Sequence, residues 1–214
     1  MTYTYGDPDA DAVLIQTVDD HDLEEIEAEA EEIRARTDKD FCLKCIKVKS
    51  WNDDLSPWEA PAVFGNAGFG GRAGSTLDGL MDLCSDRTRT YYIGGYSLAA
   101  LFAMWAAYQT DIFKGVAAAS PSIWFPGFVE YMKENRIKAD SVYLSLGDKE
   151  EKARNPIMAA VGDRIRDAAD VLKNQGINSI LEWNRGNHFK DSGTRTAKAF
   201  AWILNNTNIL RADN

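Results

Sequence analysis

One short segment of the sequence combines residue types that suit nucleophilic catalysis. Residues 94–99 read GGYSLA, where a buried β-branched and aromatic run gives way to an apolar helical run. A strand-to-helix turn tight enough to expose Ser97 needs small neighbours two residues away on each side, and Gly95 and Ala99 meet that need. The positive end of the following helix would point at the serine, and the Leu98 N–H would face an oxyanion on a bound substrate. The segment therefore predicts a serine nucleophile.

A serine hydroxyl is a weak nucleophile unless a base accepts its proton. The chain contains two histidines, His21 and His188. His188 lies in NRGNHF, just beyond the last predicted strand, where a parallel sheet would return it to Ser97. We therefore predict His188 as the base. For His21 we weigh three roles: a helix-start residue, a substrate contact and an alternative base.

An acid that orients the histidine is expected between the serine and the histidine, after the preceding strand. The sequence there reads LSLGDKEEK, which offers Asp148, Glu150 and Glu151. The chain order serine, acid, histidine, with each residue beyond the carboxyl end of a strand, is that of one particular fold. The residue types alone leave the choice among the three acids open.

Apolar runs that suit buried strands alternate with helical patterns along the chain. This alternation predicts one α/β domain over residues 1–214, with a mostly parallel central sheet and helices on both faces. Asn155 is the expected cap of the best-marked helix, whose inward stripe is Ile157, Val161, Ile165, Ala168 and Leu172. Strands are predicted at 12–18, 42–48, 90–94, 115–120, 142–147 and 179–183, and helices at 22–36, 75–84, 98–109, 127–135, 156–175 and 193–205.

Most of the acidic charge lies near the start of the chain. The protein has 24 Lys and Arg against 33 Asp and Glu, and residues 1–40 hold 14 of those acids with three bases. The helix at 22–36 is expected to place an apolar stripe against the core and its carboxylates in water, with Asp22 and Glu25 paired at its start. Because no basic stripe is present, nucleic acid is not an expected partner.

The cysteines and one uncharged stretch indicate the cellular compartment in which the protein is expected. Cys42, Cys45 and Cys84 are too few for a secreted disulfide framework, and the N-terminus lacks a signal-peptide pattern, so the cytoplasm is expected. In a strand, Cys42 and Cys45 would point to opposite faces, about 10 Å apart, which disfavours a disulfide or zinc pair. Residues 90–110 carry no charge, but two glycines divide them into a strand and a helix, so no membrane span is expected.

The longest stretch without a clear period is residues 53–77, which are rich in glycine. Its glycines match neither a phosphate-binding loop nor a dinucleotide fingerprint, and the two histidines are far apart, so we expect no cofactor and no metal. Trp58 and Phe69 from this stretch, together with Trp124, are candidates for an apolar wall that binds substrate. Core packing is the alternative role for each.

At this point the chain resembles the α/β-hydrolase superfamily, and more narrowly the bacterial esterases related to siderophore esterases. The resemblance rests on GGYSLA, on SPSIW at 120–124, on LGDKE at 146–150 and on GNHF at 186–189. It implies a triad of Ser97, an acid within 148–151 and His188, acting on a small-molecule ester or related acyl compound. It also implies a minimal fold without a lid domain.

The resemblance bears further on the acid and on the oxyanion hole. In the resembled fold the acid commonly falls three residues after a glycine that ends its strand, which from Gly147 favours Glu150. Asp148 is then expected to cap backbone N–H groups of its own loop. The second oxyanion donor is implied to be the backbone N–H of Val18 or Asp19, although this chain reads TVDDHD there, without the HG pair of many hydrolases.

These observations favour a serine hydrolase that cleaves a carboxylic ester or related acyl bond through an acyl-enzyme. One alternative is a non-catalytic protein of the same fold that binds or scaffolds. The other is an acyltransferase that uses the same residues with a different acceptor. Neither the physiological substrate nor the oligomeric state follows from the residues.

Overall fold

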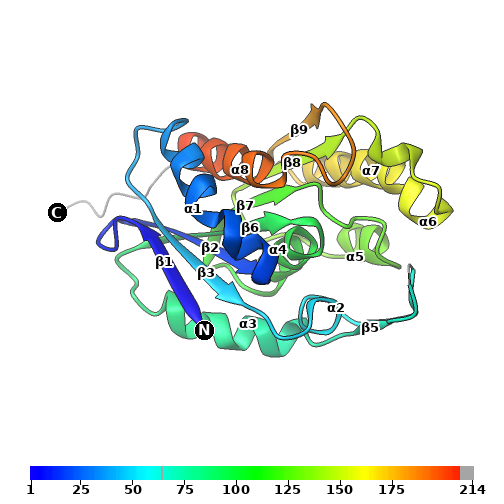
Figure 1. Cartoon of the computed structure of the whole chain (residues 1–214), viewed down its shortest axis with the longest axis horizontal. Helices are drawn as coiled ribbons and strands as arrows, with labels where there is room; N and C mark the ends of the chain where they lie inside the picture. Colours follow the sequence, from blue (N-terminus) through cyan, green and yellow to red (C-terminus); the bar gives the residue numbers. More distant parts are fainter. Residues whose placement is uncertain (64, 208–214) are drawn as a thin grey trace.

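A seven-stranded sheet forms the centre of the fold in the computed structural model, which describes residues 1–63 and 65–207. Its strands run in the order β1-β3-β2-β6-β7-β8-β9 (Figure 1). The six predicted strands are confirmed to within two residues at each end, and they pair in parallel: β2 (Ala12–Val18), β3 (Cys42–Lys47), β6 (Thr90–Tyr96), β7 (Phe113–Ala119), β8 (Ser141–Gly147) and β9 (Asn178–Asn184).

One strand at the edge of this sheet was not predicted from the sequence. β1 (Thr2–Gly6) pairs antiparallel with β3. Its residues alternate threonine and tyrosine and contain no apolar run, so it lacks the signal of a buried strand. An edge strand that is partly exposed needs no such run. The sheet is therefore mostly parallel, as predicted, with one antiparallel strand that covers the β3 edge.

Helices cover both faces of the sheet, as the sequence predicts. α1 (Asp20–Arg34) and α8 (Ser192–Asn206) pack side by side on one face (Figure 1). α4 (Ser97–Gln109) lies on the other face and is buried from Leu98 to Tyr108, in agreement with its apolar composition all round. The same face carries α3 (Ala73–Met81), α5 (Phe128–Glu134) and α7 (Val161–Asn174).

The start of α1 differs from the prediction. Asp19 is the cap, because its Oδ1 accepts the Asp22 N–H at 2.9 Å and its own N–H donates to Asp22 Oδ2 at 3.2 Å. This reciprocal pair is a capping box with aspartates at both positions. The predicted pairing of Asp22 with Glu25 is therefore wrong, and the helix begins earlier than expected.

One carboxylate of α1 does not face water. Glu29 is 7% exposed and shares the buried stripe of Ile26, Ala30 and Ile33. Burial raises the pKa of Glu29 well above its ordinary value, and the charge of Asp22 raises it further. Spacing of one helical turn from Ile26 places this side chain inward despite its type.

The predicted helix at 156–175 is interrupted. α6 (Pro156–Ala159) ends at Ala160, and α7 begins at once with Val161. Asn155 is confirmed as the cap, since its Oδ1 accepts the N–H groups of the second and third helical residues. Ile157 is 47% exposed, so its predicted inward position is wrong: the apolar stripe of α7 does not extend across the break. The other four stripe residues are buried.

Residues 53–77 contain several short elements, with residue 64 lying outside the described residues. α2 (Trp51–Asp54) leads into β4 (Glu59–Ala60), which pairs antiparallel with β5 (Phe69–Gly70). α3 then starts at Ala73 and continues into the 3-10 helix η1 (Asp82–Cys84), so the helix predicted at 75–84 is present in two parts. Figure 1 shows α2 and β5 at the end of the molecule near α5.

The structure agrees with the predictions that Cys42 and Cys45 point to opposite faces of a strand and that the uncharged stretch is a strand followed by a helix. Cys42 and Cys45 are both free, and they contribute to the cores on opposite faces of β3. Residues 90–109 form β6 and α4, and Thr110 is the C-cap of α4. Across the described part of the chain, no helix has the length and apolar character needed to cross a bilayer.

Candidate active site

Ser97 lies in the turn between β6 and α4, in a backbone conformation that few residues adopt. Its φ is +58°, in the left-handed region. Gly95 has a φ of +155°, and a Cβ on it would lie 2.9 Å from the Cβ of Ala99. No side chain fits at that distance unless the turn opens. The small residues two positions either side of Ser97 therefore have the steric role that the sequence analysis gives them.

Ser97, His188 and one of the three candidate acids form a continuous hydrogen-bonded chain. Ser97 Oγ lies 3.0 Å from His188 Nε2, and His188 Nδ1 lies 2.7 Å from Glu150 Oε2. The histidine side chain is 25% exposed, whereas that of the glutamate is 5% exposed. The three residues follow β6, β8 and β9, whose carboxyl ends meet at one edge of the sheet. Parallel strands thus bring together residues that are far apart in the sequence.

Glu150, in the 3-10 helix η2 (Glu150–Lys152), is held by several donors. Its Oε1 accepts the Gly147 N–H at 2.7 Å, the Ser120 hydroxyl at 2.8 Å and Arg195 Nη1 at 3.1 Å. Burial acts to raise the pKa of Glu150, but hydrogen bonding and charge from His188, with the Gly147 and Ser120 hydrogen bonds, lower it below its ordinary value. The carboxylate is therefore ionised at neutral pH.

The other two candidate acids have different partners. Asp148 Oδ1 accepts the Gly186 N–H at 2.8 Å, and Glu151 forms an ion pair with Arg166 at 2.9 Å. Asp148 therefore does cap a backbone N–H, but one from the loop that carries the histidine rather than from its own loop. The expected partner was wrong because β8 and β9 are neighbours, which places the two following loops side by side.

The three predicted oxyanion donors are backbone N–H groups at the end of β2, at the cap of α1 and at the start of α4. Leu98 is the second residue of α4, and the side chain of the cap residue Tyr96 makes no hydrogen bond to the helix start. The N–H of Asp19 is engaged by Asp22 Oδ2 in the capping box of α1. Val18 is the last residue of β2, and its carbonyl accepts the Val48 N–H at 3.1 Å. The N–H and carbonyl of one strand residue point to the same side, so the Val18 N–H faces β3, away from Ser97. Leu98 thus stays a predicted donor, whereas Val18 and Asp19 are both engaged elsewhere.

The SPSIW segment after β7 contacts both Ser97 and Glu150. Ser122 Oγ lies 3.3 Å from Ser97 Oγ, and the Ser122 N–H donates to the Ser97 carbonyl at 3.0 Å. Ser120 has a φ of +43° and donates to Glu150. In the sequence this segment stood out only through its resemblance to the corresponding segment of α/β-hydrolases. Its polar residues directly after a buried strand are the signal that points to a role in the site.

Two other contacts in the site were not anticipated. Tyr96 donates its hydroxyl to the His188 carbonyl at 2.7 Å, and the two rings lie 5.2 Å apart. Arg195 is 2% exposed and contacts Glu150. A signal for Arg195 exists in the sequence, since this charged residue falls on the same stripe of the last helix as Ala199 and Ile203.

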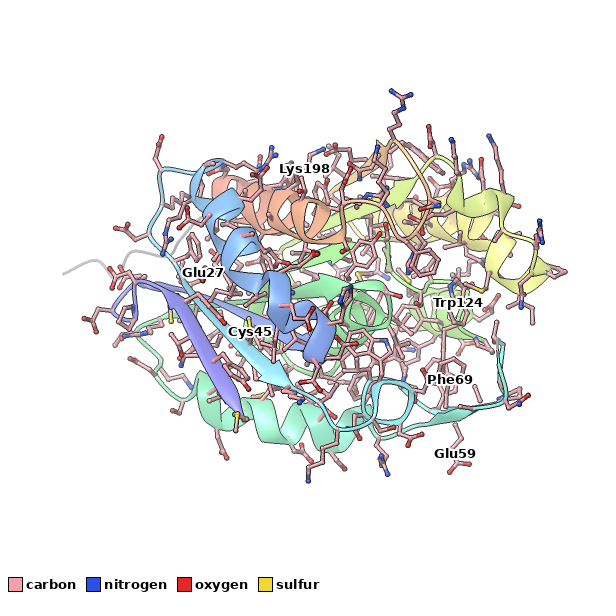
Figure 2. The ribbon with its side chains drawn as sticks, viewed as in Figure 1. Glu27, Cys45, Glu59, Phe69, Trp124 and Lys198 are labelled. Carbon is pink, nitrogen blue, oxygen red and sulfur yellow. The ribbon has the colours of Figure 1, made fainter. Side chains whose placement is uncertain are left out.

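The predicted wall residues belong to one aromatic cluster. Trp58 is half-buried, lies against Phe125, Phe128 and Tyr131, and donates its Nε1–H to the Pro126 carbonyl. Phe69 is 4% exposed, so core packing is its observed environment. Phe69 and Trp124, both labelled in Figure 2, lie next to each other with ring centroids 6.1 Å apart. Trp124 follows Ser122 by two residues, which connects this cluster to the site.

His21 lies in the first turn of α1 and is exposed. Its side chain is 79% accessible, and its Nδ1 is 3.9 Å from Glu24. The ring that contacts Ser97 is that of His188. Within the described residues, no group of three or more His, Cys, Asp or Glu is arranged to hold a metal ion.

Solved structures with a similar architecture include several esterases. An IroE-like serine hydrolase from Shewanella oneidensis has a TM-score of 0.76 at 14% identity, over 95% of this chain and 75% of that one. The siderophore hydrolase EstA from Aspergillus nidulans has a TM-score of 0.64 at 16% identity, over 95% and 94% of the two chains. The chain has the α/β-hydrolase fold.

A third α/β-hydrolase neighbour is longer than this chain. The enterobactin esterase FES from Shigella flexneri has a TM-score of 0.62 at 13% identity, and the match covers 95% of this chain and 55% of that one. A scan against protein-family models finds no match, and a search of curated proteins finds none either. The likeness therefore concerns the α/β-hydrolase fold, and the chemistry has to be argued from the site.

Proposed function

We propose that this protein is a serine hydrolase that cleaves carboxylic esters of small molecules. The observation that carries the proposal is the chain of contacts from Ser97 through His188 to Glu150, at 3.0 and 2.7 Å, with Ser97 on a turn whose φ is +58°. The likeness to proteins solved as a serine hydrolase, a siderophore hydrolase and an enterobactin esterase supports an ester as the substrate.

In the first half-reaction, Ser97 Oγ attacks the ester carbonyl carbon while His188 Nε2 accepts the hydroxyl proton. The electron pair of the carbonyl moves onto its oxygen, where the Leu98 N–H and the positive end of α4 stabilise it. The bond to the leaving alcohol then breaks, and His188 returns the proton to that alcohol. An acyl group remains on Ser97.

In the second half-reaction, a water molecule attacks the acyl-enzyme and gives its proton to His188 Nε2. Collapse of this intermediate releases the carboxylic acid and restores the Ser97 hydroxyl. Throughout, Glu150 Oε2 accepts the Nδ1–H of His188, which fixes the tautomer and stabilises the imidazolium. An acyltransferase differs only in the acceptor that replaces water.

A panel of short 4-nitrophenyl esters and a fluorophosphonate probe test the proposed function together. We expect the purified protein to release nitrophenolate and to gain one probe adduct on the peptide that contains Ser97, because the probe reacts with serines activated by a base. Transfer to an added alcohol at a rate above hydrolysis would identify an acyltransferase. Absence of both labelling and turnover would identify a non-catalytic protein of this fold.

The role of the acid is tested by comparing Glu150→Gln with Asp148→Asn. We expect Glu150→Gln to reduce kcat by up to about 10⁴, because the wrong imidazole tautomer then faces Ser97. Asp148→Asn should keep most of the activity and cost about 1 kcal/mol of stability, since it weakens one loop contact. The measurements are steady-state kinetics and thermal unfolding of both variants.

Thermal unfolding matters for this pair because Glu150→Gln also leaves the Arg195 guanidinium without a counter-charge. Removing one partner of a buried ion pair costs about 3 to 5 kcal/mol. Rates are therefore compared well below the unfolding transition of each variant. If Asp148→Asn is the inactive variant and Glu150→Gln turns over normally, Asp148 takes the role and our assignment fails.

A further inference from the structure

A buried arginine beneath the site has no part in the mechanism above. Arg195 lies in the first turn of α8, and its side chain is 2% exposed. A guanidinium is rarely buried without a counter-charge and a full set of hydrogen bonds, because the loss of hydration is otherwise too costly. The contacts that compensate this burial therefore indicate what the residue does.

The guanidinium of Arg195 contacts all three segments that carry the proposed triad. Nη1 lies 3.1 Å from Glu150 Oε1 and 3.0 Å from the hydroxyl of Tyr96, the residue before the nucleophile. Nη2 lies 3.3 Å from the carbonyl of Arg185, in the loop that carries the histidine. Nη1 is also 3.3 Å from the hydroxyl of Ser120, which donates to the same carboxylate oxygen.

These contacts divide the two oxygens of Glu150 between separate tasks. Oε1 receives Arg195, the Gly147 N–H and the Ser120 hydroxyl, whereas Oε2 lies 2.7 Å from His188 Nδ1. Rotation of the carboxylate would break several short contacts at once. A carboxylate held in this way presents the same oxygen to the imidazole at every turnover.

We propose, resting on the proposed function, that Arg195 is a positioning residue that holds Glu150 with one oxygen toward His188 and offsets part of its negative charge. Arg195 acts through Glu150 and does not touch the substrate. With the guanidinium present, a protonated His188 faces an ion pair. Without it, the imidazolium would face an uncompensated buried anion and would hold its proton more strongly.

Other charged or titratable groups near His188 do not duplicate this role. Asp148 is exposed and holds the Gly186 N–H, while Lys190 and Asp191 follow the histidine, are exposed and pair with each other at 3.9 Å. Tyr96 donates to the His188 carbonyl. Among the described residues the buried charged side chains are Glu29, Glu150 and Arg195; of these, Glu150 contacts the ring and Arg195 contacts Glu150.

The test uses two substitutions that separate charge from geometry. Arg195→Gln keeps amide donors but removes the charge, whereas Arg195→Lys keeps the charge but loses the planar fork. Both are made with His21→Gln, so that His188 is the single histidine and its ring protons are observed without overlap in an NMR titration. The matched control is the His21→Gln protein with Arg195 intact.

We expect the midpoint of the His188 titration to be higher in Arg195→Gln than in the control, because one nearby positive charge is lost. The acid limb of the kcat/KM profile should move upward by the same amount. In Arg195→Lys the midpoint should stay near that of the control, while kcat falls at unchanged KM because an ammonium cannot hold the three segments together. A role in stability alone would move neither the midpoint nor the limb.

An unshifted midpoint in folded Arg195→Gln would overturn the proposal. If that variant does not fold, Arg195→Lys decides: a kcat equal to that of the control would also overturn the proposal. The NMR measurement requires no turnover, so it separates the two conclusions. Absence of ester hydrolysis in the wild-type protein counts against the proposed function, and an unshifted titration counts against the role of Arg195.

Discussion

Ser97→Ala is expected to reduce ester hydrolysis by at least about 10³-fold and to abolish fluorophosphonate labelling. The physical reason is that in the proposed mechanism Ser97 Oγ forms the bond to the acyl carbon, and it is the hydroxyl 3.0 Å from His188 Nε2. Stability should barely change, because alanine and serine bear the same strain at a φ of +58°. Steady-state kinetics, intact-protein mass after labelling and thermal unfolding measure these three effects.

Ser122→Ala is a suitable matched control for this substitution. It removes a buried hydroxyl that lies 3.3 Å from Ser97 Oγ but leaves the nucleophile and its contact with His188 in place. Loss of one hydrogen bond of this kind is expected to cost about tenfold or less. If homogeneous Ser97→Ala protein still turned over at a rate near that of the wild type, Ser97 would not be the nucleophile.

His188→Ala is expected to cause a loss as large as that of Ser97→Ala, because members of a triad act as a unit. For the same reason, the double variant Ser97→Ala/His188→Ala should be no slower than either single variant. The measurement is kcat/KM for all three proteins with one activated ester.

His21→Ala is the control for this second prediction, since His21 is the other histidine of the chain. Its side chain is 79% exposed and lies in the first turn of α1, near Glu24. We expect its removal to change kcat/KM by much less than the removal of His188. The reverse ranking, with His21→Ala inactive and His188→Ala active, would contradict the assignment of the base.

The places of Ser97 and His188 in the fold were predicted correctly from the sequence: Ser97 follows β6 and His188 follows β9. The turn at Ser97 depends on small residues within five positions of the chain, so sterics alone indicate it. Alternating apolar runs indicated the parallel strands, and the place of His188 beyond the last strand distinguished it from His21. A buried helix such as α4 is also visible in the sequence because it lacks charge on every side.

Other features were decided by contacts between distant segments. Glu150 and Asp148 are two residues apart in one loop, yet one meets His188 and the other meets Gly186. Which of them reaches the imidazole depends on how the loops after β8 and β9 pack together. The residue types alone left that choice open, and the resemblance favoured Glu150 through its distance from Gly147.

The sequence by itself thus determined the fold class, the place of Ser97 in a strand-to-helix turn and the strand ends at which its proposed partners lie. The tertiary structure decided that Arg195 and Ser120 contact Glu150, that Glu29 is buried and that β1 extends the sheet. The physical reason is that periodicity reports which face of an element is buried, whereas pairing across 45 residues, as between Glu150 and Arg195, depends on how the elements pack.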